Sequence, residues 1–185
     1  MIKNTLKEYE NIALSDKEVL KLIDGRANLI LYSYLHKYKK IDDILNPYGA
    51  CIILFESLPR YGHWCCIFKV NDKLLEFFNP YGGWIEGYPD ESLNYIPLNF
   101  RLKSYQYYPY LSILMYNSKY ELSYNEYRFQ KHNKDIKTCG RWTALRIIFR
   151  HLSLNRFYKM IKSLEKELKI NSDEVVTLLT MYINK

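Results

Sequence analysis

The sequence predicts a single α+β domain, and two observations lead to that class. Three short segments with the apolar and aromatic content of strands follow one another between residues 50 and 78. Helical patterns lie on both sides of them, at residues 15–25 and from Gly140 onward. Strands grouped between helices, rather than alternating with them, are typical of the α+β class. We therefore expect one sheet with helices packed against it, in one domain over residues 1–185.

Length and composition agree with this prediction. The 185 residues are 48% hydrophobic, which is enough for one compact domain with a buried core, and they contain no internal repeat or linker. No apolar run is long enough to cross a bilayer, and Met1–Glu10 is charged rather than built like a secretory signal. We therefore expect an intracellular protein that is neither secreted nor membrane-bound.

The first predicted helix begins at a capping box. Ser15 and Glu18 have the required spacing, an apolar run follows them, and Gly25 suits the position after the last turn. Residues 28–45 carry further apolar periodicity, interrupted by lysines. Residues 46–49, with the sequence Asn-Pro-Tyr-Gly, then predict a turn.

The predicted strands form an antiparallel meander over residues 50–55, 64–70 and 74–78. A proline and two glycines within residues 79–83 end the last strand, because they cannot extend a hydrogen-bonded ladder. Residues 85–135 are rich in tyrosine and weakly patterned, and within them residues 111–116 are interpreted as a further strand.

Three helices are predicted in the C-terminal part of the chain. The first begins at Gly140 and places Trp142 and Leu145 on one apolar face. The second begins near Asn155. The third follows Asn171, because residues 171–174 have the spacing of an N-terminal cap.

The cysteines and histidines do not predict a disulfide framework or a metal site. Two of the four cysteines, Cys65 and Cys66, are adjacent, and no CxxC pair occurs. The four histidines show no ligand-like spacing to the cysteines, so we expect no metal and no cofactor. Because neighbouring strand residues point to opposite faces, one of Cys65 and Cys66 is expected in the core and the other partly exposed.

Three residues suggest nucleophilic catalysis. Cys139 precedes a predicted helix, where the first amides and the helix dipole are expected to lower its pKa and favour the thiolate; the alternative is a small buried apolar residue. His63 lies just before one predicted strand, and Asn79 follows the end of the next. Antiparallel neighbours bring such ends together, so Asn79 can orient the imidazole. A Cys, His and Asn set is the chemistry of papain-like proteases, although the chain order differs.

The motifs that contain these residues resemble one protein family. Gly62-His63-Trp64, Phe77-Phe78-Asn79-Pro80-Tyr81-Gly82, an upstream glutamine and Thr138-Cys139-Gly140-Arg141-Trp142 together resemble the adenain/Ulp1-like cysteine proteases, most closely those of large DNA viruses, virophages and related mobile elements. The resemblance spans roughly residues 15–153. It implies a central mixed sheet flanked by helices, with the nucleophile at a helix start.

The resemblance also implies a role for each site residue. His63 is the general base, Cys139 the nucleophile, and Asn79 the group that orients the base, where many relatives carry a carboxylate. Gln130, nine residues before the cysteine, is expected to help form the oxyanion hole, and Gln106 is expected to be a surface residue.

The function implied is that of a viral maturation protease in the host cytoplasm or the virion. It would cleave a capsid or core precursor after a Gly-Gly-type site. One alternative is a deubiquitinase or deSUMOylase, which applies the same chemistry to isopeptide bonds. Another is a non-catalytic nucleic-acid-binding protein, since a net charge of +7 attracts DNA without sequence preference.

Other residues near these motifs have simpler interpretations. His132 and His151 are expected at the surface. Tyr81 and Trp84, with the glycines at 82 and 83, form either part of a substrate cleft or a packing corner.

Overall fold

The computed structural model describes residues 2–58, 60–86 and 109–183, and its centre is a mixed sheet of five strands in the order β1-β2-β3-β4-β5. The middle strands form an antiparallel meander, and each edge strand runs parallel to its neighbour. The predicted meander and the expected mixed sheet are therefore confirmed. The strands are β1 (Asn28–Leu31), β2 (Ala50–Leu58), β3 (Tyr61–Lys69), β4 (Leu74–Phe78) and β5 (Glu121–Tyr124).

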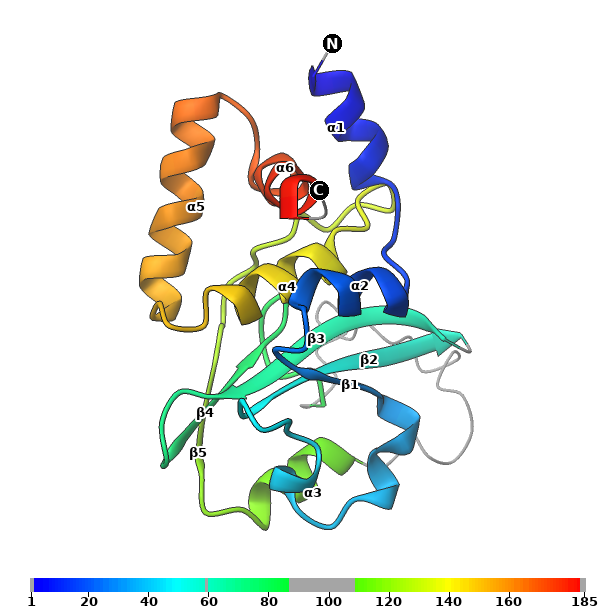
Figure 1. Ribbon diagram of the computed structural model, residues 1–185, viewed down its shortest axis with the longest axis vertical. Coiled ribbons are helices and arrows are strands. Elements are labelled where there is room, and N and C mark those ends of the chain that lie inside the picture. The colour runs from blue at the N-terminus through cyan, green and yellow to red at the C-terminus, as the bar shows by residue number, and fades with distance from the viewer. Residues whose placement is uncertain (1, 59, 87–108, 184–185) are drawn as a thin grey trace.

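Helices cover both faces of the sheet (Figure 1). On one face α2 (Asp16–Ile23) and α4 (Cys139–Ile148) lie against the strands, and α6 (Ser172–Ile183) packs on α4. Beside α6 lie α1 (Ile2–Glu10) and α5 (Leu154–Leu168). The other face is covered by α3 (Tyr110–Tyr116) and two 3₁₀ turns, η1 (Tyr32–Lys37) and η2 (Ile41–Asp43).

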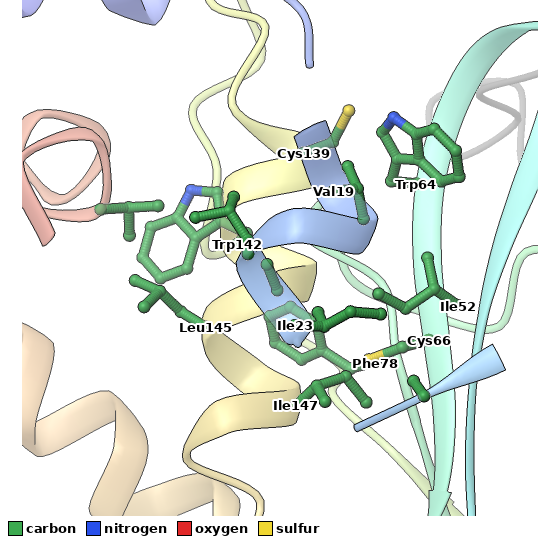
Figure 2. Close-up of a cluster of buried hydrophobic side chains, with 14 of the residues drawn as sticks. Val19, Ile23, Ile52, Trp64, Cys66, Phe78, Cys139, Trp142, Leu145 and Ile147 are labelled. Atoms are coloured by element: carbon green, nitrogen blue, oxygen red, sulfur yellow. The ribbon is translucent and has the colours of Figure 1, made fainter. Parts of the chain in front are cut away.

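Because both faces are covered, neighbouring residues of the central strands enter different cores. Cys66 lies in the core between the sheet and α4 that Figure 2 shows, whereas Cys65 lies in the core on the α3 side. Both are fully buried, so the expectation that one would be partly exposed is wrong. The two residues do point to opposite faces of the sheet, but both faces are covered, so neither side chain reaches the surface.

The capping box at the start of α2 is confirmed. The Ser15 hydroxyl accepts a hydrogen bond from the Glu18 amide, and the Glu18 carboxylate accepts one from the Ser15 amide. The helix ends where Asp24 and Gly25 adopt positive φ angles of 46° and 71°. A residue in the left-handed conformation just after a helix closes its last turn, and the predicted end of this helix near Gly25 is confirmed.

The predicted strand at residues 111–116 is wrong, because these residues form α3. The side chains that α3 buries are Leu111, Leu114 and Met115, which follow helical rather than strand spacing. Three further elements, α1, β1 and β5, were not predicted.

The predicted C-terminal helices are confirmed. Cys139 is the first residue of α4, and Ser153 caps α5. At the start of α6 the Asn171 side chain accepts a hydrogen bond from the Glu174 amide, and Glu174 accepts one from the Asn171 amide. Within the described ranges, no helix has both the length and the apolar character needed to cross a membrane.

Candidate active site

His63 and Asn79 meet as the order of the strands predicted. His63 lies within β3, rather than just before it, and Asn79 immediately follows β4. The Nε2 atom of His63 lies 2.8 Å from the Oδ1 atom of Asn79, and both side chains are buried. An amide oxygen only accepts hydrogen bonds, so Nε2 carries the proton and Nδ1 carries the lone pair of the neutral ring.

The Asn79 amide is fixed in this orientation by its other partners. Its Nδ2 group donates to the carbonyl oxygens of Gly82 and Gly83 at 2.8 and 3.2 Å, and its Oδ1 also accepts from the Tyr81 amide at 3.0 Å. Gly82 and Gly83 have φ angles of 82° and 74°, a conformation that disfavours other residues. The turn after β4 therefore exists in the form that directs the amide oxygen at the imidazole.

A second asparagine holds the backbone of Asn79. The side chain of Asn125, which is fully buried, accepts from the Asn79 amide at 3.0 Å and donates to the Asn79 carbonyl at 2.7 Å. This reciprocal pair fixes the end of β4 in the same way as a strand neighbour would. No short sequence pattern indicates this role, because Asn125 lies forty-six residues away from Asn79.

Close packing of α4 on β3 brings Cys139 to Trp64, the residue that follows His63. The backbone amide of Trp64, the residue after His63, interacts with the Cys139 sulfur. The Trp64 carbonyl accepts a hydrogen bond from the Thr143 hydroxyl at 3.0 Å. A Cβ atom on Gly140 would lie 3.1 Å from the Trp64 ring, so a larger residue there would push α4 away from the strand. Figure 2 shows Cys139 at the start of α4, facing Trp64.

A cavity of about 240 Å³ brings the remaining site residues together. Its lining includes Cys139, Gln130, Tyr81, Gly62 and His132. The Tyr81 ring stacks on the imidazole of His63, with ring centres 4.5 Å apart and planes 17° from parallel. Cys139, Gln130 and Tyr81, whose ring covers the imidazole, therefore line one cavity.

Gln130 lies in this cavity with its amide group directed by two acceptors. Its Nε2 lies 3.0 Å from the Ile136 carbonyl oxygen and 3.2 Å from the Tyr81 hydroxyl oxygen. The Gln130 Oε1 is buried and has no hydrogen-bond partner within residues 2–58, 60–86 and 109–183. Gln106, the other glutamine, lies outside the described residues.

Burial determines the protonation of the Cys139–His63 pair. It raises the pKa of Cys139 to about 11, although the backbone amides of Trp64, Gly140 and Cys139 itself act to lower it. It lowers the pKa of His63 to about 3, with the Asn79 hydrogen bond acting in the opposite direction. The resting pair is therefore a neutral thiol and a neutral imidazole. The expectation of a lowered Cys139 pKa is wrong, because loss of hydration outweighs the helix-start amides.

The expectations for the neighbouring residues have mixed outcomes. His132 and His151 are exposed as predicted, but His132 also lines the cavity and meets the Tyr81 ring edge-on. Tyr81 belongs to the cavity. Trp84 is a packing residue, because it lies against Phe77 and its indole donates to Ser112.

No group of three or more His, Cys, Asp or Glu side chains suited to a metal ion occurs in the described part of the chain. The four cysteines are free thiols, and all are buried.

The chain is 50% identical over 176 residues to "Uncharacterized protein V9" of the Sputnik virophage. The match covers 95% of this chain and 98% of the virophage protein. No protein-family model matches the chain. Identity at this level over almost the whole of both sequences establishes common descent, and the chain therefore belongs to the family of virophage protein V9.

Proposed function

We propose that this protein is a cysteine endopeptidase of the adenain/Ulp1-like type that processes a viral precursor polypeptide. One observation supports the proposal above the others. The imidazole of His63 is oriented by Asn79, and the sulfur of Cys139 is held against the amide of the residue that follows His63. A nucleophile, a base beside it and an amide that orients the base are the three parts of a papain-like catalytic unit.

The reaction starts from neutral groups. As the Cys139 sulfur attacks the substrate carbonyl carbon, the thiol proton moves to Nδ1 of His63, the nitrogen that does not face Asn79. His63 then gives this proton to the leaving amine, the C–N bond breaks, and a thioester remains on Cys139. A water molecule, deprotonated by His63, hydrolyses the thioester and restores the thiol.

Developing charge on the substrate oxygen requires donors that are already in place. The Cys139 amide, at the start of α4, is one such donor in this proposal. The Gln130 amide is the second, because it lies in the same cavity as the sulfur. Of its two acceptors, the Tyr81 hydroxyl is the one that the substrate oxygen replaces, since the Ile136 carbonyl continues to hold the amide in position.

On the strand side the cavity is lined by Tyr61 and Gly62 of β3. A Cβ atom on Gly62 would lie 2.0 Å from the Phe55 carbonyl oxygen, so β2 and β3 approach closely here only because Gly62 has no side chain. Cleavage after a Gly-Gly-type sequence is proposed from the resemblance described above. The relative comes from a virophage, which fits a viral setting, and within that setting the proposed substrate is a viral precursor such as a capsid or core protein.

The test is incubation of the purified protein with the capsid precursor of its own virus, with Cys139→Ala as the inactive control. We expect wild-type protein to produce new N-termini after a small residue and the control to produce none. A profile that prefers a basic or large aromatic residue before the cut would contradict the specificity. Cleavage of a ubiquitin-like conjugate, with the precursor intact, would favour an isopeptidase; DNA binding without any cleavage would contradict a protease.

A further inference from the structure

Asp173 is a buried carboxylate that has no part in the proposed reaction. Asp173 lies in the first turn of α6, outside the region of the family resemblance, and is 2% exposed. The reciprocal hydrogen bonds between Asn171 and Glu174 fix the start of this helix. The position of the Asp173 carboxylate is therefore set by α6 and not by the segments that it contacts.

The two oxygens of Asp173 bind two different parts of the candidate active site. Oδ1 accepts from the Thr138 hydroxyl at 2.5 Å and from the Trp142 indole at 2.8 Å, on either side of Cys139. Oδ2 accepts from the backbone amide of Lys131, the residue after Gln130, at 2.9 Å. One side chain thus joins the start of α4 to the loop that carries Gln130.

We propose that Asp173 is a positioning residue that fixes Gln130 relative to Cys139, so that the second oxyanion donor is in place before substrate binds. This inference rests on the proposed protease function. All three partners donate hydrogen bonds, so both oxygens of Asp173 must act as acceptors. An ionised carboxylate meets this requirement. Burial raises the pKa of this carboxyl, and the three donated bonds oppose that shift.

An asparagine at position 173 would keep the hydrogen bonds to the start of α4 and lose the one to the Gln130 loop. Its single oxygen serves Thr138 and Trp142, which are two donors, and its amide nitrogen then faces the Lys131 amide, so donor meets donor. Asp173→Asn therefore keeps the start of α4 and releases the Gln130 loop. Glu174→Gln is the matched control, because it makes the same chemical change one residue along the helix and retains an oxygen for the Asn171 amide.

Two measurements on the full chain test the proposal. Amide hydrogen exchange reports on position whether or not a substrate is known. In Asp173→Asn we expect faster exchange at Lys131 than in wild type or Glu174→Gln, with unchanged protection within α4. Unchanged exchange at Lys131 would overturn the inference about Asp173. If the wild-type protein does not cleave the precursor, the proposed protease function is contradicted, and the exchange result still decides whether Asp173 positions the Gln130 loop.

The second measurement is turnover in a double-mutant cycle. Misplacement of a catalytic group by about 1 Å lowers turnover by about a hundredfold, so Asp173→Asn should lower kcat by about ten- to a hundredfold with little change in KM. In a Gln130→Ala background the same change should cost about twofold or less, because the donor that Asp173 positions is gone. Wild-type kcat in Asp173→Asn, or effects that multiply in the double variant, would overturn the proposal.

If Asp173→Asn does not fold, Thr138→Val and Thr138→Ser carry the test. Serine keeps the hydroxyl that donates to Oδ1, and valine removes it. We expect the serine variant to retain turnover and the valine variant to lose it; equal turnover would count against the role of Asp173.

Discussion

The neutral state of His63 predicts a specific response of folding stability to acid. Burial lowers the pKa of His63 to about 3, whereas a histidine in the unfolded chain titrates near 6.5. The unfolded chain therefore binds one more proton over this range. The stability that His63 contributes is complete above about pH 6.5 and is lost as the pH falls toward about 3.

The expected loss between about pH 7 and about pH 4.5 is about 2.5 kcal/mol, from about two pH units at 1.36 kcal/mol each. Another buried group opposes it. Burial, with Asp173 and Glu174 nearby, raises the pKa of Glu10 to about 7, so Glu10 adds stability as the pH falls over the same range. Wild-type protein alone therefore cannot report on His63.

The assay is urea unfolding of wild type and His63→Gln at both pH values. Glutamine does not titrate, and its amide can donate to Asn79 as the imidazole does. On acidification, wild type should lose about 2.5 kcal/mol relative to His63→Gln. A resting thiolate–imidazolium pair would raise the pKa of His63 and reverse the sign, so a relative gain in wild type would refute the neutral pair.

Five substitutions test other parts of the site. Cys139→Ala and His63→Ala should each abolish precursor cleavage, whereas Asn79→Ala should retain measurable turnover because the amide orients the base without taking part in bond making. Gln130→Ala should lower kcat by about a hundred- to a thousandfold while iodoacetamide still alkylates Cys139 at the wild-type rate; near-normal turnover would remove Gln130 from the oxyanion hole. Gly62→Ala should lower the free energy of unfolding by about 1 to 3 kcal/mol, because its methyl group meets a carbonyl oxygen of β2; unchanged urea unfolding would contradict this.

The sequence was most informative where local chemistry determines the structure. The Ser15 cap, the end of β4 and the start of α4 follow from short patterns of polar, turn and apolar residues, and all three are confirmed. Asn79 follows the end of β4, Cys139 begins α4, and His63 lies on β3, the strand that pairs with β4. The meeting of His63 and Asn79 could be predicted because antiparallel pairing converts sequence spacing into proximity.

The features of the site that could not be predicted from the sequence depend on contacts between distant segments. Asn125 and Asp173 hold the site from positions forty-six residues from Asn79 and thirty-five residues from Thr138. Burial of Cys139 and His63 depends on helices packed over the sheet, so the direction of their pKa shifts required the structure. The α3 segment was misassigned because a short apolar run fits a helix and a strand equally well.

The central claim is that Cys139 is the nucleophile and is activated by His63, and covalent labelling tests it most directly. A Gly-Gly peptide with a thiol-reactive vinyl ester at its C-terminus should modify the folded protein at Cys139 alone. The three other cysteines are fully buried in the cores on the two faces of the sheet. We expect peptide mapping by mass spectrometry to find one adduct, on Cys139, and to find it greatly reduced in His63→Ala. An adduct on Cys51, Cys65 or Cys66 in place of Cys139, or equal labelling of wild type and His63→Ala, would contradict the account.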